Sequence, residues 1–318
     1  MLEILSITSP IFILIGLGYF AVRAALFSRA DMRVLGTFVI RFALPAMLFR
    51  ALSERPFDEV MNSGYLIAYA LGSLAAMGVA ILLALKWRKR DFLSSVIIGM
   101  GASSSNSAFI GLPVAVQVLG PVGSVAMALC LLVENLLMLP LLLIMADRAG
   151  HKRASIVAML RGTLASLFRN PMLMAIAIGF AFALFGLALP APLSKVVDML
   201  SFASGPLALF VIGGSLAGMG VKGMVADVTL ITVAKLVLHP AAVLIAVLLV
   251  PGIGPELQAA AVLIACVPMF SIYAIMGQKY GLEGMCSAAL VVATVASFVS
   301  ISIIIWVMEL TGFIPALS

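Results

Sequence analysis

Apolar runs of about 18 residues or more follow one another along almost the whole of this 318-residue chain. Runs of that length with few charges are typical of helices that cross a lipid bilayer, where every backbone polar group must be bonded within the protein. Hydrophobic residues make up 64% of the chain and charged residues 10%, which excludes a large water-soluble core. The amino-terminal stretch MLEILSITS lacks the basic residues of a signal peptide, so we expect the first run to be a retained span.

Ten membrane spans can be placed in the sequence, and they predict an all-α integral membrane protein. Their expected ranges are residues 4–22, 34–52, 63–85, 92–119, 121–145, 171–189, 196–219, 227–250, 257–280 and 285–308. The loops after the odd-numbered spans contain 14 Lys and Arg residues, whereas the termini and the remaining loops contain 3. Because basic loops stay on the cytoplasmic side, we expect a multi-pass protein of the cell (inner) membrane with both termini outside.

The other charged and sulfur-containing residues narrow the class of protein further. The net charge of +6 reflects the membrane orientation, so we expect no nucleic-acid partner. Cys130, Cys266 and Cys286 lie in apolar segments without CxxC spacing, and His151 and His239 do not form a metal-binding pair. We therefore expect no disulfide framework, no metal site and no cofactor.

The two halves of the chain repeat each other at an offset of 161 residues. The related positions are Pro10 and Pro171, Gly18 and Gly179, Pro45 and Pro206, Leu48-Phe49 and Leu209-Phe210, Gln117 and Gln278, Gly120 and Gly281, and Gly123 and Gly284. Because each copy contains an odd number of spans, the second must enter the membrane from the opposite side. The sequence thus predicts a 5+5 inverted repeat, with one unit at residues 1–146 and the second at 171–318. Residues 147–170 form a basic cytoplasmic linker that contains a candidate short interfacial helix.

The fourth span, residues 92–119, is interrupted in its middle. Pro113 has no N–H, and its ring clashes with the carbonyl group of Phe109, so a regular helix cannot continue through it. Gly111 and the polar run at residues 103–106 weaken the helix further, because short polar side chains compete for backbone groups. An opened span is tolerated where it packs in protein or lines a watery cavity, which is a place for a ligand. A simple proline kink with Ser and Asn packed between helices is the alternative.

The ninth span is also interrupted, by Pro268 near its middle. Pro268 lies 155 residues after Pro113, so the two breaks correspond in role but not residue for residue. Half-helices that begin at such breaks present free N–H groups, which favour an anion. A pair of interrupted segments in the two halves is the best sequence indicator of a secondary transporter's substrate site.

The residues beside these breaks are therefore the candidate substrate-binding residues. Asn106 offers both a donor and an acceptor, and the nearby hydroxyl groups either bind substrate or pack between helices. The predicted set is Ser104, Ser105, Asn106, Ser107, Gly111 and Pro113 at the first break, and Pro268, Met269, Ser271 and Tyr273 at the second.

Ionisable residues inside spans are expensive, and we treat them as functional by default. Glu134 lies halfway along the fifth span, where it could bind and release a proton during transport; a permanently protonated structural Glu is the alternative. Lys235 could neutralise a substrate carboxylate or pair with Glu134, although its place near the cytoplasmic end also allows its side chain to extend to the membrane surface. We favour such an extension for Arg41, and we interpret His239 as a packing histidine.

Four segments resemble the auxin efflux carrier family, and together they cover nearly the whole chain. They are Asn106 followed by FIGLP at 109–113, RNPMLMAIAIG at 169–179, ALPAMLF at 43–49 and GPLALFVIGGSL at 205–216, which are similar to the family's broken fourth, sixth, second and seventh helices. The resemblance implies a sodium/proton-antiporter-like fold, shared with bile-acid symporters, in which broken helices 4 and 9 cross. It also implies panel and crossover domains interleaved between the repeats, and elevator-type alternating access. Bacterial members are often assigned to malonate, malate or other small carboxylates, and plant PIN-type members export auxin.

We therefore expect a secondary transporter, either a permease or an efflux carrier, that moves a small organic carboxylate and is coupled to protons. A channel or uniporter would contain similar breaks but does not require a ten-span repeat. No nucleophile–base set, metal-ligand set or Walker A sequence indicates an enzyme or an ATP-driven pump. A sodium-coupled symporter of the bile-acid type is the alternative, but that family's acidic residue at the second crossing is absent around Pro268. The sequence leaves open the direction of transport and the formation of a homodimer.

Overall fold

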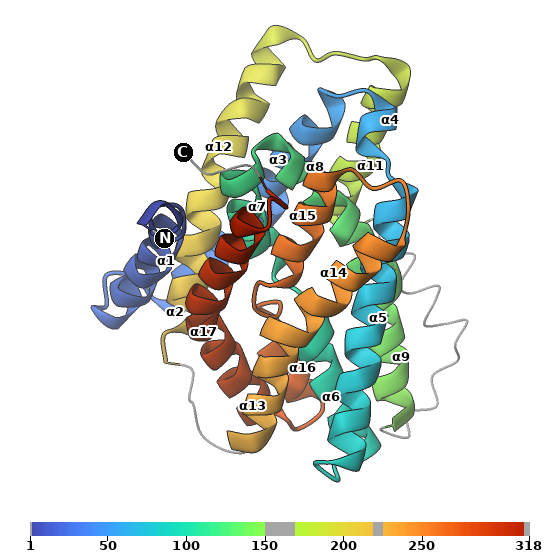
Figure 1. Cartoon of the computed structure of the whole chain (residues 1–318). Coiled ribbons are helices and arrows are strands. Elements are labelled where there is room, and N and C mark those ends of the chain that lie inside the picture. Colours follow the sequence, from blue (N-terminus) through green and yellow to red (C-terminus); the bar gives the residue numbers. More distant parts are fainter. Residues whose placement is uncertain (1, 150–168, 219–224, 315–318) are drawn as a thin grey trace.

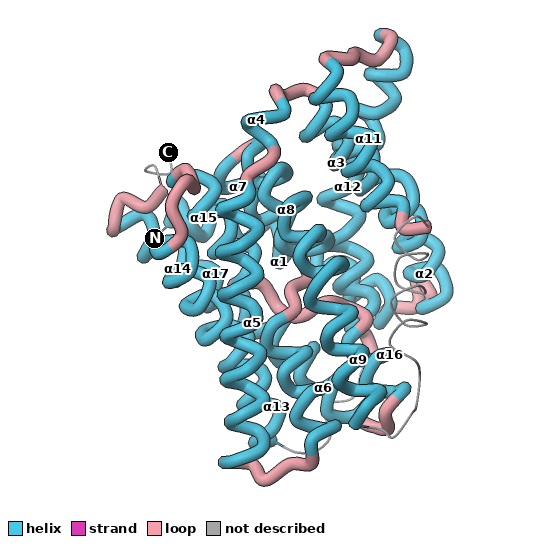
Figure 2. Tube along the Cα trace, turned by 90° about the vertical axis from the view of Figure 1, so that its right-hand side faces the viewer, coloured by secondary structure: helices cyan, strands magenta, loops and turns pink. Residues whose placement is uncertain are grey.

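The computed structural model describes residues 2–149, 169–218 and 225–314, and every regular element in these ranges is a helix (Figures 1 and 2). Within these ranges, six helices are long and apolar enough to cross a membrane: Arg29–Ser53, Ser63–Lys86, Pro121–Ala149, Ala191–Leu216, Val225–Leu249 and Glu283–Leu310. All ten predicted spans coincide with helices, although the fourth, sixth and ninth contain only continuous helical segments of 15 residues or fewer. The prediction of an all-α membrane protein is confirmed. The candidate interfacial helix of the linker falls outside the described residues.

The described helices divide between the two halves of the chain. The first half contains α1 (Leu2–Arg23), α2 (Arg29–Phe38), α3 (Leu44–Ser53), α4 (Phe57–Val60), α5 (Ser63–Lys86), α6 (Phe92–Ser103), α7 (Leu112–Leu119), α8 (Pro121–Val133) and α9 (Leu139–Ala149). The second half contains α11 (Pro171–Phe185), α12 (Ala191–Leu216), α13 (Val225–Val233), α14 (His239–Leu249), α15 (Pro255–Ala265), α16 (Tyr273–Lys279) and α17 (Glu283–Leu310).

Four π-helical turns interrupt these helices, and each ends two residues before a proline. They are η1 (Val39–Ala43) before Pro45, η2 (Ser107–Gly111) before Pro113, η3 (Glu134–Met138) before Pro140 and η4 (Ala234–Leu238) before Pro240. A proline ring clashes with the carbonyl group four residues earlier. A π turn bonds residues five apart and widens the helix at that point, which lets the helix continue past the proline.

The two predicted breaks are present, but the first lies upstream of its expected position. The backbone leaves the helical conformation at residues 104–106, between α6 and η2, and at residues 266–272, between α15 and α16. Figure 2 shows loop at mid-height in the helical bundle, where these segments lie. The backbone therefore opens within the predicted polar run at residues 103–106, whereas the expectation that Pro113 itself opens the span is wrong. The π turn accommodates Pro113, and the helix opens instead where Ser and Asn side chains offer the backbone other partners.

The helices of the second half follow those of the first at a nearly constant offset. α15, α16 and α17 begin 163, 161 and 162 residues after α6, α7 and α8, respectively. The unwound residues 266–272 before α16 thus correspond, in the second half of the chain, to the unwound residues 104–106 before η2 and α7 in the first half.

Helix contacts follow the same correspondence. A Cβ atom added to Gly18 of α1 would lie 1.9 Å from the carbonyl oxygen of Phe210 in α12. One added to Gly179 of α11 would lie 3.3 Å from the carbonyl oxygen of Phe49 in α3. Gly179 and Phe210 follow Gly18 and Phe49 by 161 residues. The same two positions therefore meet twice, each time across the two halves of the chain.

The helices pack in two groups. The first group contains α1, α2, α3, α11 and α12, and the second contains the helices from α5 to α9 and from α13 to α17. The groups meet where α12 contacts η2, α3 contacts α8, and α1 contacts α7 and α17. In Figure 1 the loop between α5 and α6 lies at the lower end of the molecule, whereas α4 and the start of α12 lie at the upper end.

Candidate functional site

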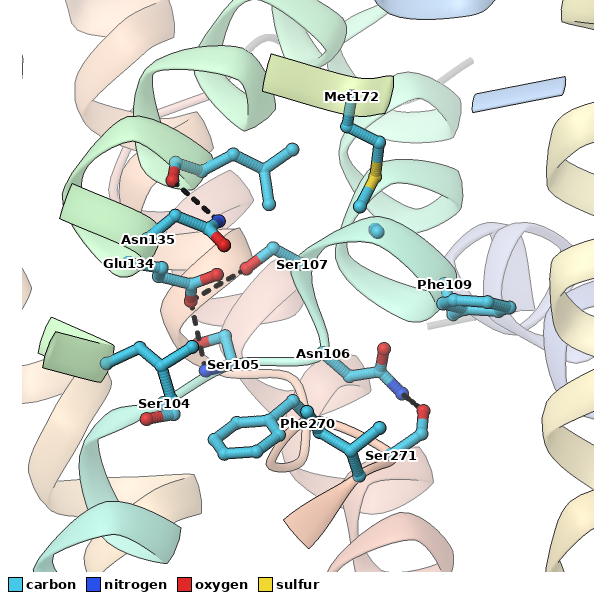
Figure 3. A pocket seen from close by; sticks show the side chains of 14 residues that line it. Ser104, Ser105, Asn106, Ser107, Phe109, Glu134, Asn135, Met172, Phe270 and Ser271 are labelled. Atoms are coloured by element: carbon cyan, nitrogen blue, oxygen red, sulfur yellow. Dashed lines mark hydrogen bonds between the residues drawn. The ribbon is translucent and has the colours of Figure 1, made fainter. Parts of the chain in front are cut away.

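Two hydrogen bonds join the two breaks directly. The backbone N–H of Asn106 donates to the carbonyl oxygen of Pro268 at 2.8 Å, and Asn106 Nδ2 donates to Ser271 Oγ at 3.0 Å (Figure 3). An unwound segment inside a membrane protein cannot satisfy its polar groups within a helix. Here each break supplies hydrogen-bond partners to the other, and Asn106 is held by both its backbone and its side chain.

A cavity of about 190 Å³ lies beside this junction. It is lined by Ser104, Ser105, Asn106, Ser107, Ala108, Phe109, Leu131, Glu134, Asn135, Leu139, Met172, Phe270, Ser271 and Ile272. A water molecule takes up about 30 Å³ in the liquid, so the cavity has room for about six waters or one small organic molecule. Its walls come from both breaks and from α8, η3, α9 and α11, and it therefore lies where the two helix groups meet.

The helix that begins after the first break directs its N-terminus at this cavity. Ser107, Ala108 and Phe109 line the cavity, and their backbone N–H groups have no hydrogen-bond partner within the described residues. The first N–H groups of a helix carry the positive end of its dipole. This arrangement favours an anion.

One acidic side chain of the protein already occupies the edge of this N-terminus. Glu134 Oε1 accepts hydrogen bonds from the backbone N–H of Ser105 at 3.0 Å and from Ser107 Oγ at 2.9 Å (Figure 3). Glu134 is partly exposed and lines the cavity. A carboxylate bound in the cavity would therefore lie close to the carboxyl group of Glu134.

Lys235 lies behind Ser105 and is completely buried. Its Nζ donates to Ser105 Oγ at 2.7 Å and to the carbonyl oxygen of Ala265 at 2.9 Å, and it lies 2.6 Å from His239 Nδ1. Lys235 therefore links the first break to the end of α15. The alternative in which its side chain extends to the membrane surface is wrong, because the amino group finds three acceptors inside the protein.

The other two ionisable residues behave as expected. His239 is buried, and its Nε2 lies 2.9 Å from Ser73 Oγ, so both ring nitrogens have partners. Arg41 is exposed, in agreement with an extension to the membrane surface. The ion pair between Lys235 and Glu134 is not formed in this structure; Ser105 is instead hydrogen-bonded to both.

The structure brings together about half of the predicted site residues. Ser104, Ser105, Asn106, Ser107, Ser271 and Glu134 line the cavity, whereas Gly111, Pro113, Pro268, Met269, Tyr273 and Lys235 do not. Tyr273 is buried, and its hydroxyl group donates to the carbonyl oxygen of Ile97 at 2.9 Å. The ring also fills the space beside Gly101, where an added Cβ atom would lie 2.6 Å from it. Tyr273 therefore packs α16 against α6 and does not face the cavity.

Sequence reasoning missed four of the larger lining residues, namely Phe109, Asn135, Met172 and Phe270 (Figure 3). Asn135 could have been found, because it is a polar residue next to Glu134 in the middle of a span. The two phenylalanines and Met172 carry no such signal, since each belongs to an apolar run. These three residues lie at the cavity only because α11 and the second break pack against the first break.

The described residues contain no group of three His, Cys, Asp or Glu side chains that could hold a metal ion. Cys130, Cys266 and Cys286 are buried and free. The chemistry that the cavity offers is therefore hydrogen bonding through N–H, hydroxyl and amide groups, together with one carboxyl group.

Comparison with known proteins identifies relatives along the whole chain. The family described as "Membrane transport protein" matches residues 5–305. A protein of Rhizobium meliloti (strain 1021) named "Putative malonate transporter" is 27% identical over 317 residues, which cover 99% of each chain. The "Uncharacterized transporter YfdV" of Escherichia coli (strain K12) is 24% identical over 246 residues, which cover 74% of this chain and 76% of that protein.

Proposed function

The chain belongs to the membrane transport protein family, which includes the auxin efflux carriers, and we propose that it is a secondary transporter of a small organic carboxylate. The family match confirms the resemblance carried by Asn106, FIGLP and RNP, and it makes the chain a multi-pass membrane transporter rather than an enzyme. The observation that carries the carboxylate assignment is the N-terminus of η2, whose unpaired N–H groups belong to residues that line the cavity.

The size of the cavity supports a substrate of the malonate class. Malonate contains about seven non-hydrogen atoms, comparable with the volume of about six waters that the cavity offers. The relative named for malonate matches this chain from end to end. In our proposal one substrate carboxylate accepts hydrogen bonds from the N–H groups of Ser107 and Ala108, and the amide of Asn106 orients the molecule.

We assign proton coupling to Glu134. Two unit charges about 5 Å apart repel by about 3 kcal/mol at an effective dielectric constant of about 20. A substrate carboxylate entering the cavity would therefore favour the protonated form of Glu134, whose carboxyl group already lies at the same helix N-terminus. The proton then crosses with the anion and offsets one negative charge, whose movement across the membrane potential is otherwise worth about 2.3 kcal/mol per 100 mV.

Alternating access in this proposal rests on a 5+5 inverted repeat. The constant offset of the helices and the repeated contacts of Gly18 with Phe210 and of Gly179 with Phe49 support that architecture. The first helix group would serve as the panel domain and the second as the crossover domain that carries the breaks. The cavity lies between the two groups, so a movement of one past the other would change which side of the membrane it faces.

The orientation belongs to the same proposal. The basic loops lie after the odd-numbered spans, and the loop between α5 and α6 lies at the opposite end of the molecule from α4 and the start of α12 (Figure 1). By the positive-inside rule that loop faces the cytoplasm, and both termini face the outside of the inner membrane.

Counterflow in proteoliposomes tests the function. Vesicles loaded with unlabelled malonate should accumulate labelled malonate, and other small carboxylates added outside should compete, whereas sugars and neutral amino acids should not. Empty vesicles and vesicles without protein are the controls. Absence of exchange with every carboxylate tried, by protein that remains monodisperse, would contradict the proposal.

A further inference from the structure

A second cavity, of about 420 Å³, lies on the other side of α7. Its walls come from α3, α7, α8 and α12, so it too lies between the two helix groups. Pro113 lines this cavity, whereas Phe109 and Ala108 of the same helical segment line the cavity beside the breaks. The two cavities are therefore separated by the segment that runs from η2 into α7. The second one lies toward the end of α3 and the start of α8, away from the basic loops.

Arg50 of α3 brings a positive charge to this second cavity. Its Nε donates to Glu54 Oε1 at 3.4 Å, and Asp198 Oδ1 lies 3.0 Å from the same nitrogen without the alignment of a hydrogen bond. The guanidinium carbon lies 5.5 Å from the centre of the Phe202 ring, which places it over the ring face. These three contacts orient the guanidinium group while leaving its terminal amino groups without a hydrogen bond to any described residue.

Two hydroxyl groups add to the polar surface of the same cavity. Ser124 and Ser201 line it, are 4% and 8% exposed, and their Oγ atoms make no hydrogen bond within the described residues. The terminal amino groups of Arg50 and the hydroxyl groups of Ser124 and Ser201 therefore face one space, and Glu54, the partner of Arg50 Nε, also lines it.

We propose that this cavity is a second binding site for a small carboxylate, an outer vestibule in which the anion is held by Arg50 before it enters, or after it leaves, the cavity beside the breaks. The terminal amino groups of an arginine match the two oxygens of a carboxylate, and such paired bonds are strong and specific. The hydroxyl groups of Ser124 and Ser201 would donate hydrogen bonds to the other oxygens of the ligand. This inference rests on the proposed carboxylate substrate and adds a second binding site along its transport path.

The ion pairs of Arg50 do not prevent anion binding. The side chains of Glu54 and Asp198 are 56% and 36% exposed, and exposed ion pairs contribute little free energy. Both pairs use Nε, so a carboxylate can bind the terminal amino groups without displacing either acidic residue. The acidic residues would keep the guanidinium group in place and limit the affinity, which suits a site that must release its ligand.

A fluorescent reporter tests the site without relying on transport. Replacing Trp87 and Trp306 with Phe, and Phe202 with Trp, leaves one tryptophan next to Arg50. Asn106→Ala in the same background weakens the site beside the breaks. We expect titration with malonate, at constant ionic strength against chloride, to give a saturable change in fluorescence that survives Asn106→Ala. Arg50→Gln should weaken this binding at least tenfold, and Lys195→Gln, which removes an exposed positive charge from the same end of α12, should leave it unchanged.

Equilibrium dialysis with labelled malonate provides the second measurement. The Asn106→Ala protein should bind about one malonate per chain, and adding Arg50→Gln should weaken this binding at least tenfold. Equal binding with and without Arg50, or no saturable binding to folded Asn106→Ala protein, would overturn the vestibule. Failure of the proposed function gives a different pattern, in which vesicles show no counterflow although the reporter beside Arg50 still responds to malonate.

Discussion

The backbone N–H of Asn106 donates to the carbonyl oxygen of Pro268 at 2.8 Å, and this bond joins the unwound centres of two spans from opposite halves of the chain. The side chain of Asn106 is bonded separately, to Ser271. Substitution of the side chain therefore leaves the link between the breaks in place, and the two roles of Asn106 can be tested apart.

Asn106→Ala should abolish or strongly weaken substrate binding in the cavity beside the breaks while the protein stays folded. The variant keeps the backbone bond to Pro268 and loses the amide bond to Ser271, which costs about 1 kcal/mol of stability. Malonate binding and counterflow measure the effect, and a thermal melt reports folding. Ser271→Ala is the matched control, because it removes the same bond but keeps the amide in the cavity. Counterflow at the wild-type rate in Asn106→Ala would show that the transported substrate does not depend on the cavity beside the breaks.

Glu134→Gln should retain malonate exchange and lose the response to a pH gradient. The amide cannot release a proton, but its size is nearly that of the carboxyl group, and Ser105 and Ser107 can still bond to its oxygen. Uptake by wild-type vesicles should rise when the outside is more acidic than the inside, and uptake by the variant should not. A variant whose pH-driven accumulation equals that of wild type would return Glu134 to a structural role.

Lys235→Met should lower both the thermal stability and the affinity for substrate. The change leaves the buried acceptors at Ala265 and His239 without this donor, and each unsatisfied group costs about 1–3 kcal/mol. Ser105 Oγ loses the same donor but keeps the Tyr69 hydroxyl group at 3.3 Å. Ser73→Ala is the control, since it removes only the bond on the far side of His239. If both variants melt at the same temperature, the buried amino group contributes nothing beyond packing.

Gly213→Ala should destabilise the protein by about 3 kcal/mol or more, because its new methyl group cannot fit without separating two helices. The added Cβ atom would lie 1.8 Å from the carbonyl oxygen of Ile15, where α1 and α12 pack backbone against backbone. Gly16→Ala, two positions before Gly18 on α1, meets nothing within 4 Å and should leave the melting temperature unchanged. Equal melting of the two variants would contradict the close packing of α1 on α12.

Single cysteines test the orientation of the chain in the membrane. In a variant without the three native cysteines, a cysteine in place of Pro56 should react with an impermeant maleimide added to intact cells. One in place of Lys89 should react only after the membrane is opened, because Lys89 lies in the basic loop after α5. One in place of Ser318 should behave like the cysteine at residue 56. Labelling at residue 89 from outside would reverse the orientation.

The spans and the existence of both breaks followed from the sequence, because hydrophobic length and proline act locally. The exact residues at which the backbone of the fourth span opens did not follow from the sequence. Pro113 was expected to break the fourth span, yet a π turn carries the helix past it and the backbone opens at residues 104–106 instead. Sequence pattern alone does not indicate whether a proline opens a helix or is absorbed by a wider turn.

The sequence by itself determined that this chain forms membrane helices, that two of them are interrupted, and that Asn106 and Glu134 are polar groups inside spans. The tertiary structure alone decided which of these groups meet. Glu134 reaches the N-terminus of η2, Lys235 turns to Ser105, and Tyr273 packs away from the cavity. Apolar length is a property of neighbouring residues and can be read along the chain. A contact between residues far apart depends on how side chains of several helices fill one space, and only the packed fold specifies it.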